Sequence, residues 1–455
     1  MTPGHVLARR AGTVRRLSAG GTDIAGRLII SPLRRLLTWA PDADGRVVLL
    51  AAVALYLATI ASGRLVWGVD LWPRLGVPSG PSLFFDARNV TAAWECARLG
   101  YDPLYENPCD PWSRPLNYLR PWLLLGALGL DQSHTFGFAV VLIAAMFVSF
   151  SLLVGRVPAG TGIVMALAAC SPAVMLAVER ANMDVAMFAL VASSFLWSQT
   201  FPGTGRVVSP ALMLVGAVAK IYPGFALPVF LITRSRIALR ASLLCLAGFT
   251  AYLAYSLSDI VHIARIAPQG DQFSYGARIL LANLYHRVGA DHWAGPAALK
   301  QLLAALALAV VVAAIGVRVR RGLAPPLDDM IVTPVPLMAF LAGSLVYVGT
   351  FAVGKNFDYR LVFLLLTLPQ LCLWARMPVH RLSSLASVTV VAILVLLWVG
   401  SLSQLLALWD ELASWIVAGL LTAMAAATVP RLATVNEVLF DRRVVVGHQG
   451  TTRAP

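Results

Sequence analysis

The sequence predicts an all-α protein that crosses a membrane about twelve times, and three observations lead to this fold class. Of the 455 residues, 58% are hydrophobic and only 13% are charged, with a mean hydropathy of +0.76. Apolar runs of about 20 residues, the length that a helix needs to cross a bilayer, follow one another along the chain. Arginine gathers in the N-terminal segment and in short loops between alternate runs. Together these features exclude a soluble globular protein.

The positive charge of the chain is arranged as in a membrane protein. The net charge is +14, with eight arginines among the first 46 residues and others in short loops such as 233–236 and 318–321. Cytoplasmic loops carry such an excess of cations, where it faces anionic lipid. The excess of arginine over lysine indicates a GC-rich bacterial genome. We therefore expect a multi-pass protein of the bacterial plasma membrane, surrounded by lipid, with both termini inside and no nucleic-acid partner.

The elements follow from the apolar runs in chain order. A basic cytoplasmic segment, 1–46, comes first, and its residues 24–38 could form an amphipathic interfacial helix or a plain tail. A transmembrane domain, 47–430, and a cytoplasmic tail, 431–455, complete the chain. The predicted spans are 47–66, 134–154, 159–178, 183–200, 207–219, 222–233, 238–257, 297–317, 331–352, 361–375, 383–403 and 411–429.

Two long loops lie outside the membrane in this topology, 67–133 after the first span and 258–296 after the seventh. The fifth and sixth spans are short and meet at Lys220, which indicates broken or tilted helices. Polar residues that are unusual in a membrane gather at the outer ends of the spans. A charged side chain at the centre of a spanning helix costs about 2.5–3.5 kcal/mol, so such residues indicate a functional site.

The first outer loop carries a carboxylate beyond the end of the first span. Asp86 follows two phenylalanines, and the segments 100–105 (GYDPLY) and 117–121 (NYLRP) come after it. A carboxylate fixed at the start of a lateral helix can act as a general base toward a substrate in the membrane. The alternative is a structural role, as a helix N-cap or as the partner of Arg88.

Two further segments place polar residues beside apolar spans, at 179–184 (ERANMD) and 220–223 (KIYP). Lys220 could bind an anion, or its long side chain could extend to the membrane surface. Arg180 could contact a ligand, or pair with Glu179 or Asp184.

These segments resemble those of the C-type (GT-C) glycosyltransferases that use polyprenol-phosphate sugars. The best match is glycosyltransferase family 87, which includes mycobacterial polyprenol-phosphate-mannose-dependent α-mannosyltransferases. The resemblance rests on Asp86, the GYDPLY element, the Tyr-x-x-Pro before the second span, the Asn-x-Asp at 182–184 and the Lys-x-x-Pro at 220–223. Motifs carry the resemblance over about residues 80–235. In the rest of the chain only the predicted topology is similar. The chain departs from the family at Glu179-Arg180, where a small residue is expected before the asparagine.

The resemblance implies a GT-C-like fold and transfer of a sugar, mannose first, from a polyprenyl-phosphate donor. The acceptor would be a glycolipid or a cell-envelope glycan on the extracytoplasmic face. Asp86 would take the proton of the acceptor hydroxyl as that oxygen attacks the anomeric carbon, which inverts. Cations would stabilise the charge on the departing phosphate. The chemistry requires no metal or other cofactor. Whether a divalent cation binds near Asp86 is left open.

Several cations and polar residues are candidates for this site. For the donor phosphate and sugar they are Lys220, Arg180, Lys355, Arg360, Arg278, His286 and Arg287. The other candidates are Asn182, Asp184, Tyr101, Asp102, Arg120, Tyr222 and Asp358. Residues 355–360 could instead form a turn closed by its own salt bridges. The histidines of the second outer loop have no recognised metal-ligand spacing, so no metal site is predicted there.

The cysteines divide between the first outer loop and the spans. Cys96 and Cys109 lie in the loop, where an oxidising compartment would allow a disulfide worth about 3 kcal/mol. The sequence leaves that pairing open. The other three cysteines, Cys170, Cys245 and Cys372, are expected to be buried in spans.

Other functions stay open beside this one. A polyprenyl-phosphate arabinofuranosyltransferase would use the same chemistry with another sugar. A polymerase or ligase of lipid-linked glycans would typically carry its largest polar loop late in the chain, whereas here it follows the first span. A transporter would place its ionisable groups near the membrane midplane, on broken helices and often within a repeat. The polar groups here gather at the outer helix ends, which favours an enzyme.

Overall fold

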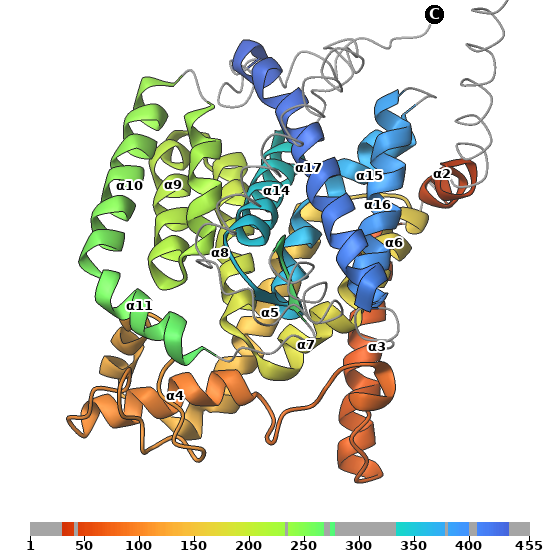
Figure 1. Cartoon of the computed structure of the whole chain (residues 1–455). Coiled ribbons are helices and arrows are strands. Elements are labelled where there is room, and N and C mark those ends of the chain that lie inside the picture. Colours follow the sequence, from red (N-terminus) through yellow and green to blue (C-terminus); the bar gives the residue numbers. More distant parts are fainter. Residues whose placement is uncertain are drawn as a thin grey trace, which may run out of the picture.

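The computed structural model describes residues 30–40, 44–232, 235–267, 274–277, 334–377, 381–399 and 407–435. The regular secondary structure of this part of the chain is helical apart from one short two-stranded sheet (Figure 1). In chain order, with η for 3-10 helices, the elements are α2 (Ser31–Thr38), α3 (Gly45–Val66), η2 (Pro73–Leu75), α4 (Phe85–Arg98), η3 (Arg120–Leu128), η4 (Gln132–His134), α5 (Thr135–Val154), α6 (Ala159–Ala169), α7 (Pro172–Arg180), α8 (Met183–Thr200), α9 (Pro202–Ala219), η5 (Tyr222–Leu231), α10 (Arg236–Tyr255), α11 (Leu257–Ile266), β1 (Ser274–Tyr275), α14 (Pro334–Val353), β2 (Asn356–Phe357), η7 (Asp358–Leu366), α15 (Leu368–Arg376), α16 (Arg381–Val399) and α17 (Ala407–Val435).

Six of the described helices are long and apolar enough to cross a membrane, and two bent helix pairs could each form one more span. By length and composition they are the helices of a multi-pass membrane protein. The six are Gly45–Val66, Gln132–Val154, Arg236–Tyr255, Val335–Val353, Leu382–Val399 and Trp409–Val429. The described residues therefore provide six to eight spans, where the sequence predicts twelve. The predicted span 297–317 lies outside them.

The bends explain part of this difference, because they divide two predicted spans. The chain turns by 57° between α6 and α7, and by 50° between η7 and α15. In each pair the second helix has a proline at one of its first positions, Pro172 and Pro369. Proline has no N–H group and its ring clashes with the preceding turn, so it begins a new helix more readily than it continues one. The predicted spans 159–178 and 361–375 are thus broken.

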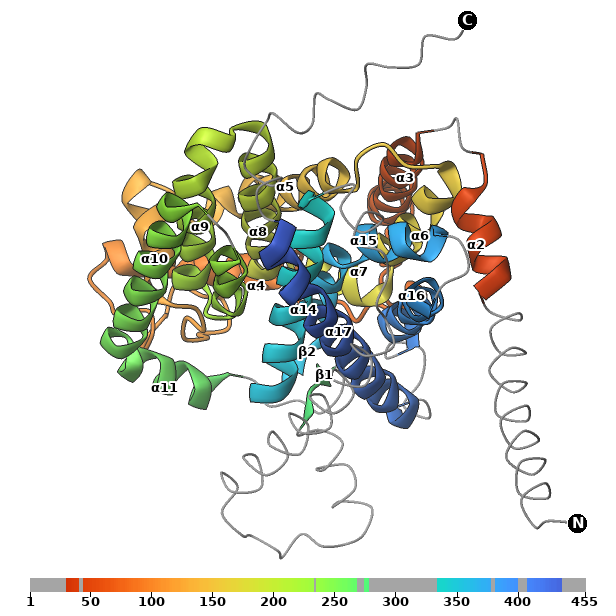
Figure 2. The same cartoon turned by 90° about the horizontal axis from the view of Figure 1, so that it is seen from above.

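The central helices of the bundle position the candidate site. Figure 2 shows α7, α8, α14 and α15 in the middle of the molecule, with α9 and α10 on one side and α2, α3 and α6 on the other. Every residue of α7 except Arg180 is buried, and α8 is buried from Met183 to Phe195 except at Leu190 and Ser193. The short helix α2, within the predicted amphipathic segment 24–38, packs against α6, where Thr161 donates a hydrogen bond to the carbonyl oxygen of Leu37 (2.9 Å).

Residues 67–134, which connect α3 to α5, form a structure that we call the first-loop platform. Its helix α4 runs across one end of the upright helices (Figure 1). Trp94 of α4 is fully buried, and its Nε1 donates to the carbonyl oxygen of Trp122 (2.6 Å). Gly126 lies so close that an added Cβ would be 2.9 Å from the Cβ of Trp94. The predicted first outer loop is therefore a packed unit with its own helices.

Helix α11 lies beside the platform, at the end of α10 (Figure 1). None of its residues is buried. Farther along the chain, β1 pairs antiparallel with β2, so that Ser274 is opposite Phe357 and Tyr275 is opposite Asn356. The sheet thereby joins the segment after α11 to the turn between α14 and η7. Most of the predicted second outer loop, including Arg278, His286 and Arg287, lies outside the described residues.

Candidate active site

Polar side chains from four separate segments meet where the platform contacts the bundle. Asp86 lies in the first turn of α4, and Asn182 and Asp184 lie at the start of α8. Lys220 ends α9, and Arg360 lies in the first turn of η7. All five are candidates named from the sequence. The structure brings them together into one connected network.

Asp86 is held by a hydrogen bond from the bundle. Its Oδ2 accepts from Nδ2 of Asn182 at 2.6 Å. The N-cap of α4 is Phe84, so Asp86 is neither the cap nor joined to Arg88 by a hydrogen bond in the described structure. Its position in the first helical turn is favourable, because the N-terminus of a helix attracts negative charge. Phe84 itself has a positive φ of 57°, which is rare for a residue with a side chain.

Asn182 connects Asp86 to the cations. Its Oδ1 accepts from Nζ of Lys220 (2.9 Å) and from the backbone N–H of Asp184 (3.0 Å). Its Nδ2 also donates to the hydroxyl of Tyr118 (3.2 Å). The residue is only 1% exposed. Both ends of the amide are therefore used inside the protein.

Lys220 is buried within the bundle, with only 9% of the residue exposed. Its Nζ is 2.7 Å from Oδ1 of Asp184. The rings of Tyr118, Tyr222 and Tyr359 surround the ammonium, with centroids at 5.0, 5.3 and 5.8 Å. Aromatic faces attract a cation at such distances. The ion pair and the rings together compensate for the burial of this charge.

Local sequence explains why Lys220 points inward. Helix α9 ends at Ala219, and Lys220 has an extended backbone (φ −157°, ψ 113°). Pro223 follows as one of the first residues of η5. Because proline cannot continue a helix, the chain turns between the two apolar segments, and the side chain at the turn enters the interior. The short predicted fifth and sixth spans correspond to α9 and η5.

Arg360 pairs with Asp184, from a distant part of the chain. Its Nε is 3.6 Å from Oδ2 of Asp184, its NH1 donates to Oδ1 of Asn356, and its guanidinium lies 4.0 Å above the ring of Tyr222. The alternative of a turn closed by its own salt bridges is therefore wrong for Arg360. Asp358 is also buried, and the carboxyl groups of Asp410 and Glu411 are near it.

Arg180 and Glu179 occupy the end of α7, next to this network. Glu179 accepts a hydrogen bond from the backbone N–H of Gly80 (2.8 Å) through Oε1, and another from that of Phe84 (3.2 Å) through its carbonyl oxygen. These bonds fix the segment that leads into α4. The Nε atom of Arg180 is buried and has no hydrogen-bond partner among the described residues.

A cavity of about 370 Å³ adjoins the network. Lys220, Arg360 and Lys355 form a cationic region of its wall, and Ile260, Ile263 and Ala264 of α11 form an apolar region. The other lining residues are Asn117, Tyr118, Leu119, Ala219, Ile221, Tyr222, Phe225, Ala267, Ser274, Thr350, Val353, Gly354, Asn356, Phe357 and Tyr359. Asp86 and Asn182 do not line it. Asn182 contacts Tyr118 and Lys220, which do line the cavity, and Asp86 contacts Asn182.

The residues that the structure describes do not use all the donors of the two central cations. Lys220 has three N–H donors, of which one is hydrogen-bonded to Oδ1 of Asn182, and its ammonium forms an ion pair with Asp184. Arg360 has five, of which one is bonded to Asn356 and another faces Asp184. Since both residues line the cavity, donors remain for an anionic group bound there.

Three further candidates, besides Asp358, lie apart from this network. Arg120 forms ion pairs with Asp102 (3.0 Å) and with Asp259 of α11 (2.7 Å). Tyr101 is exposed on the platform. His262 of α11 contacts the platform too, through a hydrogen bond between Nε2 and the carbonyl oxygen of Leu104 (2.9 Å). These contacts connect α11 to the platform.

Sequence reasoning did not select three residues that complete the site. Tyr118, Tyr359 and Asn356 surround the cations, and each lies in a polar segment next to a selected candidate. Burial and the nearby charge of Asp86 raise the pKa of Tyr118 well above its usual range. Its hydroxyl therefore keeps its proton. The signal available in the sequence was the aromatic and amide content of 117–121 and 355–360.

Arg114 fixes the start of α4 within the platform. Its guanidinium lies 3.5 Å from the centroid of the Phe85 ring and donates to the carbonyl oxygen of that residue (3.0 Å). It also pairs with Asp110 at 2.7 Å. Burial acts to raise the pKa of Asp110, but the hydrogen bonds and charge of Arg114, with a backbone N–H from Trp112, lower it overall.

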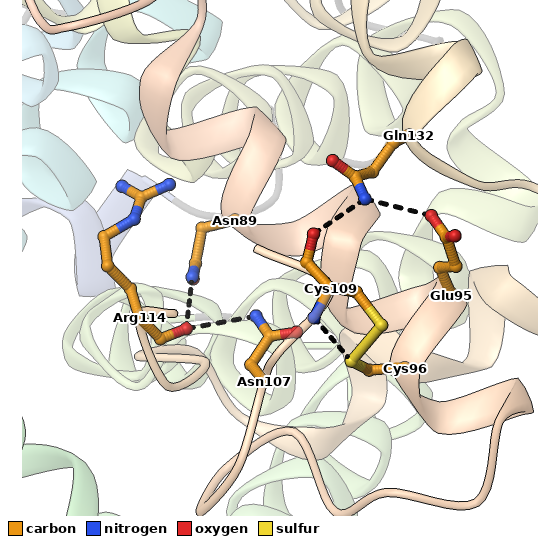
Figure 3. Close-up of a disulfide and its surroundings, with 7 residues drawn as sticks. All are labelled: Asn89, Glu95, Cys96, Asn107, Cys109, Arg114 and Gln132. Carbon is orange, nitrogen blue, oxygen red and sulfur yellow. Dashed lines mark hydrogen bonds between the residues drawn. A yellow bond between two sulfur atoms is a disulfide. The ribbon is translucent and has the colours of Figure 1, made fainter. Parts of the chain in front are cut away.

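The disulfide between Cys96 and Cys109 closes the same unit (Figure 3). It links α4 to the loop that carries Asp110. Gln132 donates from Nε2 to Oε2 of Glu95 (3.0 Å) and to the carbonyl oxygen of Cys109 (2.8 Å), as Figure 3 shows. Of the other cysteines, Cys245 and Cys372 are buried and Cys170 is partly buried at the bend between α6 and α7.

In the part of the chain that the structure describes, no group of three His, Cys, Asp or Glu side chains has the geometry to hold a metal ion. Comparison with known proteins adds no name, since no family model, curated protein or solved structure matches the chain.

Proposed function

We propose that this protein is a C-type glycosyltransferase of the bacterial plasma membrane. It transfers a sugar from a polyprenyl-phosphate donor to a glycolipid or cell-envelope glycan on the extracytoplasmic face, with mannose as the first candidate sugar and arabinofuranose as the second. The observation that carries the proposal is the hydrogen-bonded path from Asp86 through Asn182 to Lys220, because it joins a carboxylate to a cation that lines a cavity.

The cavity suits a lipid with an anionic head. Unused N–H donors of Lys220 and Arg360 can bind phosphate oxygens. The apolar wall contributed by α11 and by Phe225 can contact the first units of a polyprenyl chain. A cavity that is mostly apolar, with a few convergent charged groups, is the usual form of a ligand site.

The carboxylate and the cations can then divide the reaction between them. Oδ1 of Asp86 receives no hydrogen bond from the described residues and takes the proton of the acceptor hydroxyl. The acceptor oxygen forms its bond to the anomeric carbon as the bond from that carbon to the phosphate oxygen breaks. The electron pair leaves with the phosphate, where Lys220 and Arg360 stabilise the negative charge. Attack opposite the leaving group inverts the anomeric carbon.

One observation favours a second candidate, a transporter of an anionic solute. Arg180 and Arg360 each lie in a bent helix pair, and broken helices commonly form the binding sites of transporters. A transporter moves its solute unchanged, so the appearance of a glycosylated product separates the two functions.

The test uses purified protein, polyprenyl-phosphate-linked labelled mannose and a crude envelope-lipid acceptor, and measures label in the product. We expect transfer by the wild type and a loss of about a hundredfold or more in D86N. Asp70→Asn is the matched control, because Asp70 is an exposed carboxylate of the same platform that accepts from the backbone N–H of Trp72. It should keep the wild-type rate.

Two results would contradict the proposal. Absence of transfer with both the mannose and the arabinofuranose donors would exclude this class of enzyme. Full turnover by a normally folded D86N would show that Asp86 is not the base.

A further inference from the structure

Asn182 has two structural roles, at the end of α7 and at the start of α8. It also forms a hydrogen bond to Asp86 that neither role requires. It follows α7, whose last turn closes with hydrogen bonds from Asn182 N–H to Ala177 O (2.9 Å) and from Ala181 N–H to Val178 O (3.0 Å). This pattern is a Schellman motif. Asn182 is at the same time the N-cap of α8, because its Oδ1 accepts from Asp184 N–H.

The N-cap role uses only the oxygen of the side chain. Ser, Thr and Asp provide such an acceptor as well as Asn does. The Nδ2 group is not needed for the cap, yet it donates to Oδ2 of Asp86 at 2.6 Å. An amide is therefore present where a simple cap would need only an oxygen.

The neighbours of Asn182 determine which way its amide faces. The ammonium of Lys220 and the backbone N–H of Asp184 are donors without acceptor capacity, so the amide oxygen must face them. The NH₂ group must then face Asp86 and Tyr118, which can accept. The alternative orientation would place donor against donor on one side and oxygen against carboxylate on the other.

The backbone is strained on both sides of this hydrogen bond. Ala181, just before Asn182, has φ 43°, and Phe84, two residues before Asp86, has φ 57°. Glycine usually occupies the left-handed position of a Schellman motif, because a Cβ there clashes with the backbone. Residues held in such conformations occur often at functional sites, where surrounding contacts maintain them.

We propose that Asn182 is a positioning residue that orients Asp86 as the base and keeps it at a set distance from the phosphate-binding ammonium of Lys220. This inference rests on the proposed function. With Oδ2 bound to the amide, Oδ1 is directed to the acceptor hydroxyl. A base held by a third group is a recurrent arrangement in enzymes that remove a proton from a hydroxyl nucleophile.

Asn182→Asp separates this role from the structural ones. Aspartate is an equally good N-cap and can still accept from Lys220, but it cannot donate to Asp86. The new carboxylate also repels the ionised base. The titratable and charged groups already near Asp86 are Tyr118 of the platform, Glu179 of α7, Lys220 after α9, and Tyr359 of η7; Arg180 of α7 acts on Glu179 and Tyr359.

The measurement is the pH dependence of kcat for label transfer, with the donor KM at each pH. For N182D we expect the acid limb to move to higher pH by about one unit, because a like charge and the lost hydrogen bond both disfavour the ionised base. Asn182→Leu should lower kcat about a hundredfold at every pH, since a misplaced base is costly, with less effect on the donor KM.

Asn107→Ala is the matched control, because Asn107 is a platform asparagine only 2% exposed whose Nδ2 donates to Arg114 O (3.1 Å). It should lower the unfolding temperature and leave the pH profile in place. An N182D profile that coincides with that of active wild type would refute the inference alone. Absence of transfer by the wild type would refute the proposed function and this inference with it.

Discussion

Two walls of the cavity are held in different ways. The platform, which supplies Tyr118 and carries Asp86, is closed by a disulfide, an ion pair between the buried Asp110 and the partly buried Arg114, and a buried tryptophan. Helix α11, the apolar wall, has no buried residue. It contacts the platform through the ion pair of Asp259 with Arg120, a side chain 43% exposed, and through His262, which forms one hydrogen bond and packs against the ring of Tyr105 (centroids 4.3 Å apart).

This difference separates the fixed part of the site from the part that can open. Exposed ion pairs contribute about 0–1 kcal/mol, whereas removing the partner of a buried polar or charged group costs about 1–3 kcal/mol. The stronger interactions lie around Asp86, the proposed base. The weaker ones hold the wall that an apolar chain would contact. We therefore expect α11 to separate from the cavity far more often than the platform does.

Removal of the disulfide should have the largest effect on the platform. We expect Cys96→Ser with Cys109→Ser to lower the free energy of unfolding by about 3 kcal/mol, the value for a closed loop of this size. Thermal unfolding of the purified protein in detergent would measure the loss. Cys170→Ser, at a cysteine that forms no disulfide in the structure, is the control. Equal unfolding temperatures for the double variant and the wild type would show that the bond does not stabilise the platform.

The ion pair in the platform should be the next largest contribution, and it depends on pH. Asp110→Asn should cost about 2 kcal/mol at pH 7, because Arg114 loses a charged partner. Folding lowers the pKa of Asp110, so its contribution is complete above the unfolded value of about 3.9 and disappears as the pH falls through the folded value. The difference in unfolding temperature between wild type and variant should therefore shrink below about pH 4. A constant difference from pH 7 to pH 3 would contradict this account.

Overpacking of the platform should have a smaller effect. Gly126→Ala brings a Cβ within 2.9 Å of the Cβ of Trp94, and we expect a loss of about 1 kcal/mol as the two segments move apart. Gly137→Ala is a suitable control, since an added Cβ there meets nothing within 4 Å. A larger loss of stability in the control than in G126A would show that close packing against Trp94 is not the cause of the effect.

Loss of the ion pair between Arg120 and α11 should have the smallest effect on stability. It should nevertheless clearly increase the motion of α11. Arg120→Gln should change the free energy of unfolding by less than about 1 kcal/mol. It should still increase amide hydrogen exchange in α11 while that of α4 is unchanged. The charge exchange Arg120→Asp with Asp259→Arg should restore slow exchange in α11. Equal exchange in α4 and α11 of the wild type would remove the contrast between the two walls.

Continuous apolar runs made much of the fold predictable. Helix α8 has the bounds expected for the fourth span, 183–200, and α3, α5 and α10 begin and end within two residues of their predicted spans. The breaks in two other spans depend on prolines whose effect is decided by packing, since proline can also be accommodated as a kink. For that reason the number of spans could not be derived from hydropathy alone.

The members of the site were predictable, but their contacts were not. Each of Asp86, Asn182 and Lys220 belongs to a short polar segment beside an apolar run, which is a local signal. The hydrogen bonds that join them link residues separated by 96 and 38 positions. Arg360 illustrates the same limit, because its nearby candidate partner was Asp358 and its actual partner is Asp184. Only the packing of η7 against α7 and α8 determines that choice.

The disulfide of the platform also bears on the biosynthesis of the protein. The ribosome delivers cysteines in chain order, and Cys96 and Cys109 precede Cys170, Cys245 and Cys372. The two thiols of the platform are thus synthesised before the other three cysteines of this sequence. Their pairing does not have to await the later helices, so the unit that carries Asp86 can close before those helices are made.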